Sequence, residues 1–174
     1  RLKSIGIKVT LIRLITEVSG VPILQYSEIS ENIAIGMQLK YFGFYLLLNK
    51  GYTCILNLRS EFELVNKLSN SFTLLRIPID EYAAPSFKQL DKASDLIHNS
   101  ILSNKKIYVH CREGISRAPS CLAAYFIKYQ KLSLQESIER IKSTRYFINI
   151  LPNQMESLIQ FEIIINSKYL MNNH

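Results

Sequence analysis

The sequence predicts an α/β fold, with a central, mostly parallel, twisted sheet of about five strands flanked by helices. Two observations support this prediction. Short runs rich in β-branched, aliphatic and aromatic residues alternate along the chain with segments in which apolar residues recur at helical spacing. The chain has 174 residues, of which 48% are hydrophobic, and this suffices for one globular domain with a substantial core.

The first 22 residues are predicted to form an amphipathic helix. Apolar residues recur on one helical face, and Gly20 and Pro22 end the pattern. Charged residues interrupt the apolar run, so the segment is predicted to be neither a signal peptide nor a membrane span. We expect this helix, residues 1–22, to pack on the domain formed by residues 23–174. A helix that binds a membrane surface or a partner is the alternative.

Periodicity and turn signals divide the rest of the chain into strands and helices. Strands are predicted at residues 23–26, 32–35, 52–58, 73–77 and 106–109. Helices are predicted at residues 42–49 and 86–102, from about Pro119 onward, and after Ser133, which forms a capping box with Glu136. In a parallel sheet the carboxyl ends of the strands meet at one edge, so we expect the ligand site there.

Composition narrows the classes of partner. The formal net charge of +7 favours anionic partners, such as phosphoproteins or acidic lipid surfaces. Three cysteines without a paired framework suit a reducing cytoplasm. The sequence has no glycine-rich nucleotide motif, metal-ligand cluster, repeat or low-complexity linker, and we therefore expect no cofactor, no metal and no nucleic-acid partner.

The most informative segment is residues 110–120, His-Cys-Arg-Glu-Gly-Ile-Ser-Arg-Ala-Pro-Ser. It follows a predicted strand and leads into a predicted helix, and Gly114 permits a positive φ between them. A strand, a tight loop and a helix N-terminus in direct succession aim backbone N–H groups and the positive end of a helix dipole at one place. The segment is therefore predicted to bind an anion.

Two side chains of this segment suit chemistry on a phosphoryl group. The positive field favours the thiolate form of Cys111, which makes it a candidate nucleophile. Arg117 carries a planar guanidinium that can bind two phosphoryl oxygens at once, which a lysine cannot do. His110 is expected to fix the loop through hydrogen bonds rather than act as a base. Cys54 and Cys121 are interpreted as small buried hydrophobic residues.

Residues 110–117 resemble the signature loop of the cysteine-dependent protein tyrosine phosphatase superfamily, in the form typical of its dual-specificity phosphatases. The resemblance implies that residues 23–174 form a catalytic domain with a phosphatase-type phosphate-binding loop. It also implies that the thiolate attacks phosphorus to give a phosphocysteine, which water hydrolyses, with an aspartate acting first as acid and then as base. The residues implied to bind substrate are Arg112, Glu113, Gly114, Ile115, Ser116 and Arg117.

Asp80 is the candidate for that aspartate. It follows the predicted strand at residues 73–77 and precedes Cys111 by about thirty residues, close to where the dual-specificity enzymes carry their acid. Glu81 is the competing carboxylate. Arg59 is expected at the same edge of the sheet, where it either contacts the substrate or forms a surface ion pair with a nearby carboxylate.

Residues 145–154 resemble the stretch that precedes the last helix in these enzymes, where polar residues steady the phosphate loop or a water. Asn153 is the supporting residue that this resemblance indicates. An equally simple interpretation makes Asn153 the N-cap of the final helix, with Glu156 as its capping partner.

One position departs from the family pattern. Most members carry Ser or Thr directly after the loop arginine, where the hydroxyl helps to expel the thiolate in the second step, and this chain has Ala118. Ser116 and Ser120 flank it, and neither is an obvious substitute. The sequence therefore predicts slow breakdown of the phosphoenzyme.

Three functions remain open from the sequence. The first, which we predict, is a protein phosphatase acting on phosphotyrosine and also on phosphoserine or phosphothreonine. The second is a lipid phosphatase acting on an anionic phospholipid, because residues 141–161 also resemble the end of the phosphatidylglycerophosphate phosphatases. The third is an inactive phosphopeptide-binding module, against which the presence of Cys111, Arg117 and Asp80 argues.

Overall fold

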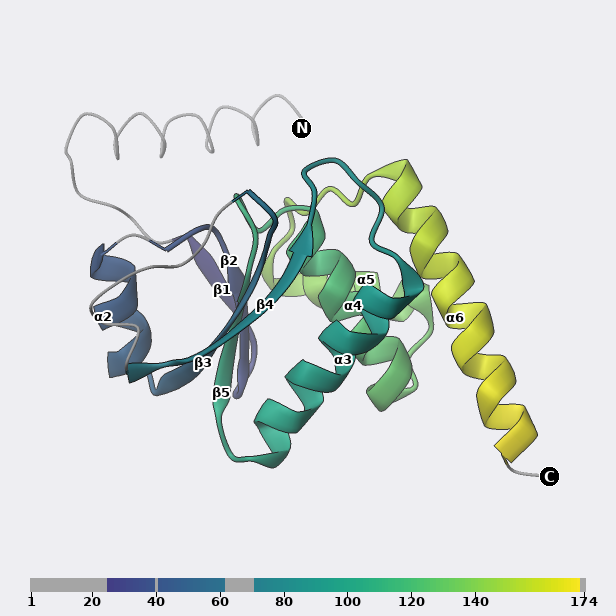
Figure 1. Ribbon diagram of the computed structural model, residues 1–174, viewed down its shortest axis with the longest axis horizontal. Coiled ribbons are helices and arrows are strands. Elements are labelled where there is room, and N and C mark those ends of the chain that lie inside the picture. Colours follow the sequence, from purple (N-terminus) through teal and green to yellow (C-terminus); the bar gives the residue numbers. More distant parts are fainter. Residues whose placement is uncertain (1–24, 40, 62–70, 173–174) are drawn as a thin grey trace.

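The computed structural model describes residues 25–39, 41–61 and 71–172, and in these ranges the chain folds into one sheet covered by helices (Figure 1). The predicted helix at residues 1–22 lies outside the described residues. The strands are β1 (Tyr26–Ser30), β2 (Ile33–Gly36), β3 (Tyr52–Arg59), β4 (Thr73–Ile79) and β5 (Lys106–His110). The helices are α2 (Tyr41–Asn49), α3 (Phe87–Leu102), α4 (Arg117–Gln130), α5 (Leu134–Thr144) and α6 (Pro152–Asn172).

The five strands lie in the order β1-β2-β5-β3-β4. β5 pairs in parallel with both β2 and β3, and β3 pairs in parallel with β4, whereas β1 is antiparallel to β2. The predicted α/β class with a mostly parallel sheet is therefore confirmed. Because β5 is the central strand, the loop that follows it emerges from the middle of the carboxyl edge, between the ends of β2 and β3.

The sheet is buried on both faces. α2 covers one face, and α3 to α6 lie on the other (Figure 1). Side chains alternate accordingly along β5: Ile107 and Val109 belong to the larger core under α3 and α4, and Tyr108 belongs to the smaller core under α2. Every residue of α4 from Arg117 to Ile127 is buried, so the helix that starts at the loop is held on all sides.

Two predicted helices begin with capping boxes. Ser133 donates its N–H to Glu136 Oε2 at 2.7 Å, and its Oγ accepts from the Glu136 N–H, as the sequence predicts. Ser86 and Gln89 form the same reciprocal pair at the start of α3. Such caps satisfy N–H groups that have no partner within the helix.

The first strand extends beyond the range that the sequence predicts. It was expected at residues 23–26, of which 23 and 24 lie outside the described residues, and β1 covers Tyr26–Ser30, a mostly polar segment. β1 is an edge strand in which only Ile29 is fully buried, so it lacks the apolar pattern that marks an interior strand. The helix predicted to carry Pro119 in its first turn is confirmed as α4, which begins at Arg117.

Asn153 is not the N-cap of the final helix. α6 begins at Pro152, a residue suited to the first helical position, and the Met155 N–H donates to the Leu151 carbonyl at 2.8 Å. Asn153 therefore lies inside the first turn, where its side chain is available for contacts outside the helix. Within the described ranges, no helix combines the length and apolar character needed to cross a bilayer.

Candidate active site

A pocket of about 300 Å³ opens at the carboxyl edge of the sheet. Three segments line it: Glu81 and Tyr82 after β4, residues 111–113 and 115–117 after β5, and Asn149 with Leu151 before α6. These are the three segments that the sequence singled out, and the fold brings them together because β4 and β5 end at the same edge. Asp80, one residue before Glu81, is exposed and is not among the residues that line the pocket.

Four consecutive carbonyl groups of the loop after β5, those of residues 112–115, accept hydrogen bonds from groups outside the loop. The carbonyls of Arg112 and Ile115 accept from the N–H groups of Gln38 and Asn149 at 3.0 and 2.9 Å. The Arg145 guanidinium donates to the carbonyls of Glu113 at 3.0 Å and Gly114 at 2.7 Å. Outward carbonyls leave the peptide N–H groups to face the pocket, which together with the N-terminus of α4 makes an anion site.

Arg145 is a residue of the site that sequence reasoning did not single out. Its side chain is 1% exposed and, besides the two loop carbonyls, it donates to Ser27 Oγ at 3.2 Å and packs on the Phe147 ring. A buried guanidinium is tolerated only where its N–H groups find acceptors, and the loop carbonyls supply them. The sequence placed Arg145 at the start of the stretch 145–154, whose polar residues were expected to steady the phosphate loop, but it did not single out Arg145 as the one that does so.

Gly114 is required by close packing as well as by its backbone angle. Its φ is +67°, and a Cβ at this position would lie 2.4 Å from the carbonyl carbon of Gly36. The positive φ expected from the sequence is therefore present. The loop lies directly against the end of β2, and no side chain fits between them.

Cys111 lies at the floor of the pocket. Cys111 is only 3% exposed, and its Sγ accepts a hydrogen bond from the Gly114 N–H at 3.2 Å. This is one of the inward N–H groups that the loop geometry provides, and it stabilises negative charge on sulfur. His110 is fully buried, and its Nδ1 lies 3.3 Å from the Cys111 carbonyl oxygen.

Burial of His110 makes the protein less stable in mild acid. Removal from water lowers the pKa of His110 to about 4, against 6.5 for the free side chain. Between pH 6.5 and pH 4, His110 is therefore protonated in the unfolded chain but neutral in the folded chain. The free energy of unfolding falls accordingly as the pH is lowered from 6.5 toward 4. We predict a free energy of unfolding about 2 kcal/mol lower at pH 5 than at pH 7 from this group. Urea unfolding at both pH values should show the difference shrinking by that amount in His110→Gln; an unchanged difference would contradict the assignment.

Arg117 is held from one side of its guanidinium. Both terminal nitrogens donate to the Glu61 carboxylate at 3.0 Å, and Nη1 also donates to the Ile79 carbonyl at 2.8 Å. No described residue accepts a hydrogen bond from the Arg117 Nε–H. This N–H and one N–H of Nη2 lie on the same edge of the guanidinium and point in the same direction. This edge is a two-donor fork, the geometry that binds two oxygens of a phosphoryl group.

Glu61 belongs to the segment 59–61 that the sequence predicts at this edge of the sheet, but its role as the partner of Arg117 was not predicted. It pairs with Arg117 and with Arg59, whose Nε lies 2.8 Å from Oε1. The hydrogen bonds from Arg117, reinforced by Arg59, hold the pKa of the Glu61 carboxyl far below its usual range. Of the two alternatives for Arg59, the ion pair with a nearby carboxylate is the one observed.

Gln154 connects the phosphate loop to the turn after β4. Its Oε1 accepts from Ser116 Oγ and, at 3.5 Å, from Ser120 Oγ, while Nε2 donates to the Ala83 carbonyl at 3.1 Å. The adjacent Asn153 Nδ2 donates to the Tyr82 carbonyl at 2.9 Å. The contacts that steady the loop directly thus come from Gln154 rather than from Asn153. Both serine hydroxyls next to Ala118 are bonded to this network.

Of the two acidic candidates, Glu81 is engaged in an ion pair. Its carboxylate accepts from Arg112 Nη1 at 3.0 and 3.2 Å. The side chain of Asp80 makes no such pair with any described residue, and its carbonyl accepts from the Ala83 N–H at 3.1 Å to close a turn. Across the described ranges, no group of three or more His, Cys, Asp or Glu side chains is placed to hold a metal ion.

Residues 35–164 match the family model of the dual specificity phosphatase catalytic domain. The chain belongs to this family. It is 28% identical over 156 residues to phosphatidylglycerophosphatase and protein-tyrosine phosphatase 1 of Mus musculus, covering 84% of this chain and 81% of the relative. It is 26% identical over 137 residues to dual specificity protein phosphatase 14 of Mus musculus, covering 78% and 68% of the two chains.

Solved structures agree with the assignment. The crystal structure of PTPMT1 superimposes with a TM-score of 0.75 at 26% identity, over 84% of this chain and 99% of that one. Tk-PTP in its active form matches with a TM-score of 0.71 at 23% identity, over 79% and 95% of the two chains, which concerns the fold alone. This dual-specificity-type phosphatase is therefore a cysteine-dependent phosphoric monoester hydrolase, as the signature loop indicated.

Proposed function

We propose that this phosphatase hydrolyses phosphotyrosine in proteins, and also phosphoserine or phosphothreonine, through a phosphocysteine on Cys111. The observation that carries the proposal is that Cys111 lines a pocket in which four loop carbonyls are bonded to groups outside the loop and Arg117 keeps one donor edge open. A phosphoryl group bound there meets inward N–H groups and a guanidinium fork while its phosphorus faces the thiolate.

The reaction has two displacements. In the first, the Cys111 thiolate forms an S–P bond as the P–O bond to the leaving group breaks, and Asp80 donates its proton to the departing oxygen. In the second, Asp80 takes a proton from water, whose oxygen attacks phosphorus, and the S–P bond breaks to return the thiolate and inorganic phosphate. Arg117 and the loop N–H groups stabilise the charge on the equatorial oxygens in both steps.

The rim of the pocket supports an aromatic leaving group. Tyr82, Ile115 and Leu151 line the pocket with mainly apolar surface, while the phosphate end is polar. An aryl ring can pack between such side chains. The net charge of +7 and three free cysteines fit a basic enzyme that acts on phosphoproteins in a reducing cytoplasm.

A lipid substrate is the second candidate, favoured by two relatives. One is named phosphatidylglycerophosphatase and protein-tyrosine phosphatase 1, and a solved structure at 25% identity and a TM-score of 0.73 is described as PTPMT1 in complex with PI(5)P. The exposed, basic Arg112 at the pocket would suit an anionic headgroup.

The two candidates are separated by one comparison of rates. A phosphotyrosyl peptide, the matched phosphothreonyl peptide and phosphatidylglycerophosphate in mixed micelles are assayed side by side, with chelator present and with vanadate as inhibitor. We expect the highest kcat/KM for the phosphotyrosyl peptide, persistence in chelator and inhibition by vanadate. Preference for the lipid would replace the proposal with the second candidate, and peptide binding without any turnover would indicate an inactive binding module.

Asp80→Asn should lower kcat/KM for a phosphotyrosyl peptide by about 10² to 10⁴, the usual contribution of a positioned acid. The loss should be smaller with p-nitrophenyl phosphate, because nitrophenolate leaves without a proton. Glu81→Gln is the matched control, and we expect less than a tenfold change because this carboxylate pairs with Arg112. Steady-state kinetics of both variants measure the two losses in kcat/KM. A larger loss in Glu81→Gln than in Asp80→Asn would show that Glu81 is the general acid.

Ala118→Ser should speed breakdown of the phosphoenzyme. Ser116 Oγ donates to Gln154 Oε1, and Ser120 Oγ donates to the Ser116 carbonyl at 2.9 Å, so neither hydroxyl proton is directed to the sulfur of Cys111. In the wild type we expect a burst of alcohol product before steady turnover, and in the variant a kcat several-fold higher with a diminished burst. Rapid-quench measurements that find no burst, together with an unaltered kcat in Ala118→Ser, would show that breakdown is not slow.

A further inference from the structure

We propose that Tyr82 is a specificity-determining residue, whose ring packs against the aryl group of the substrate. The proposal rests on the proposed function, since it concerns the leaving group of the same reaction. Tyr82 lines the pocket in the turn after β4, on the same rim as Ile115 and Leu151, and it is 71% exposed. An aromatic side chain this exposed contributes little to the core.

The backbone of Tyr82 is strained. The Ala83 N–H donates to the Asp80 carbonyl at 3.1 Å, which closes a β-turn, and Tyr82 is its third residue with φ of +67°. Turns with a positive φ at this position favour Gly or Asn, because a larger side chain crowds the backbone. The sequence places a bulky aromatic residue where the turn favours a small one.

The other strained positions have an ordinary explanation. Among described residues other than glycine, Asn104 and Lys131 also have positive φ values, and each follows the end of a helix, α3 or α4. A left-handed residue is the usual way in which a helix ends. Tyr82 does not end a helix, so this explanation does not apply to it. Strained backbone conformations are common near active sites, which suggests a functional role for Tyr82.

The strained turn is held in place by side chains from α6. Asn153 Nδ2 donates to the Tyr82 carbonyl at 2.9 Å, and Gln154 Nε2 donates to the Ala83 carbonyl at 3.1 Å. Gln154 Oε1 also accepts from Ser116 Oγ in the phosphate loop. One amide side chain thus fixes the backbone of the turn relative to the loop that holds the phosphoryl group, so Tyr82 is carried at the pocket by a fixed backbone.

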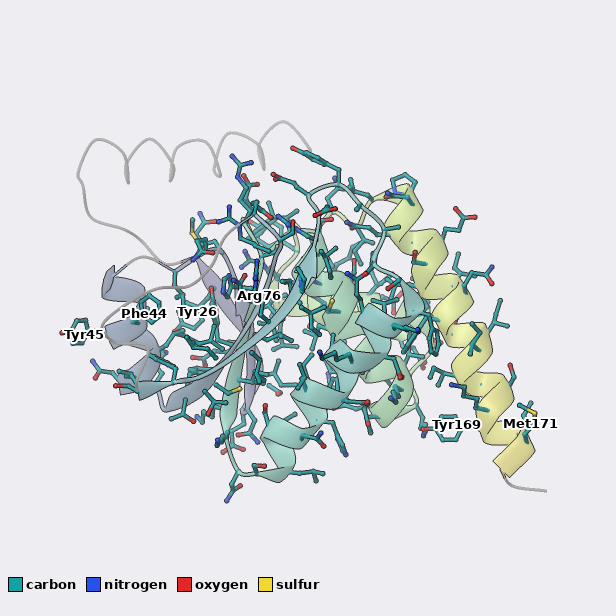
Figure 2. All side chains as sticks on the ribbon, in the orientation of Figure 1. Tyr26, Phe44, Tyr45, Arg76, Tyr169 and Met171 are labelled. Carbon is teal, nitrogen blue, oxygen red and sulfur yellow. The ribbon has the colours of Figure 1, made fainter. Side chains whose placement is uncertain are left out.

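The test uses variants that separate the ring from the backbone. Tyr82→Asn removes the ring and suits the left-handed backbone, and Tyr82→Phe keeps the ring. Tyr45→Asn changes an exposed tyrosine on α2, at the far end of the molecule from α6 (Figure 2), and serves as the matched control. KM and kcat are measured with p-nitrophenyl phosphate and a phosphotyrosyl peptide, and inhibition constants with inorganic vanadate, which has no ring.

We expect KM for both aryl substrates to rise about three- to tenfold in Tyr82→Asn, with wild-type values in Tyr82→Phe and Tyr45→Asn. The vanadate inhibition constant of Tyr82→Asn should stay within twofold, and its thermal midpoint should not fall, because the turn is relieved of strain. An unchanged KM, or vanadate affinity lost in parallel, would overturn the role of Tyr82 while leaving the phosphatase intact. Wild-type protein that turns over no aryl phosphate would overturn the proposed function together with it.

Discussion

Cys111→Ser should reduce kcat by about 10⁴ or more with every phosphomonoester, because a serine hydroxyl remains protonated where the thiol can ionise. The loop N–H groups and Arg117 are untouched by this change, so the pocket should still bind phosphorylated ligand. We therefore expect the variant to retain a phosphotyrosyl peptide, with a dissociation constant at or above the wild-type KM, because slow breakdown of the phosphoenzyme lowers KM below the dissociation constant. Stopped assays for turnover and calorimetry for binding measure the two quantities separately.

Cys121→Ala is the matched control for this experiment. Cys121 is fully buried on α4, ten residues after Cys111, and burial raises the pKa of its thiol far above the usual range. A buried, protonated thiol is a poor nucleophile, so this variant should keep turnover within a few-fold of wild type. Loss of activity in a folded Cys121→Ala protein, with activity retained in Cys111→Ser, would reverse the assignment of the nucleophile.

Arg117→Lys should lower kcat/KM by about 10³ or more, equivalent to about 4 kcal/mol of transition-state stabilisation. Lysine keeps the positive charge but has a single nitrogen, and it cannot bond Glu61, the Ile79 carbonyl and two phosphoryl oxygens at once. The loss should therefore appear in kcat as well as in the affinity for vanadate. Steady-state kinetics and vanadate inhibition measure both.

Arg76→Lys provides the comparison, because Arg76 lies on β4 (Figure 2) and donates to the Ser60 carbonyl at 2.9 Å, outside the pocket lining. We expect its kinetic constants to stay within twofold of wild type. A tenfold or smaller loss in Arg117→Lys would mean that charge alone, rather than the planar fork, provides the stabilisation.

The sequence was sufficient for the parts of the site that depend on neighbours along the chain. A strand, a glycine-containing loop and a helix start follow one another over residues 106–130, so the anion site around Cys111 could be predicted from local geometry. The parallel sheet then placed the end of β4 beside that loop, as the alternation of strands and helices implied.

The contacts of the site that join residues far apart in the chain could not be predicted from one sequence. Glu61 meets Arg117 across 56 residues, and Arg145 reaches the Gly114 carbonyl across 31. Nothing local to Glu61 or Arg145 indicates which group each will contact, because the partner is chosen by how the chain packs. The same limit explains why the sequence could not decide whether Asn153 supports the site or caps the final helix, whereas in the fold its side chain donates to the turn after β4.

The central claim is that Cys111 carries the phosphoryl group during turnover, and acid quenching followed by intact-protein and peptide mass spectrometry tests it most directly. Wild-type enzyme quenched during steady hydrolysis of p-nitrophenyl phosphate should show a fraction of molecules heavier by one phosphoryl group, localised to the peptide that contains Cys111. Cys111→Ser should show none. Full turnover with no adduct in the wild type, or an adduct on another residue, would contradict the account.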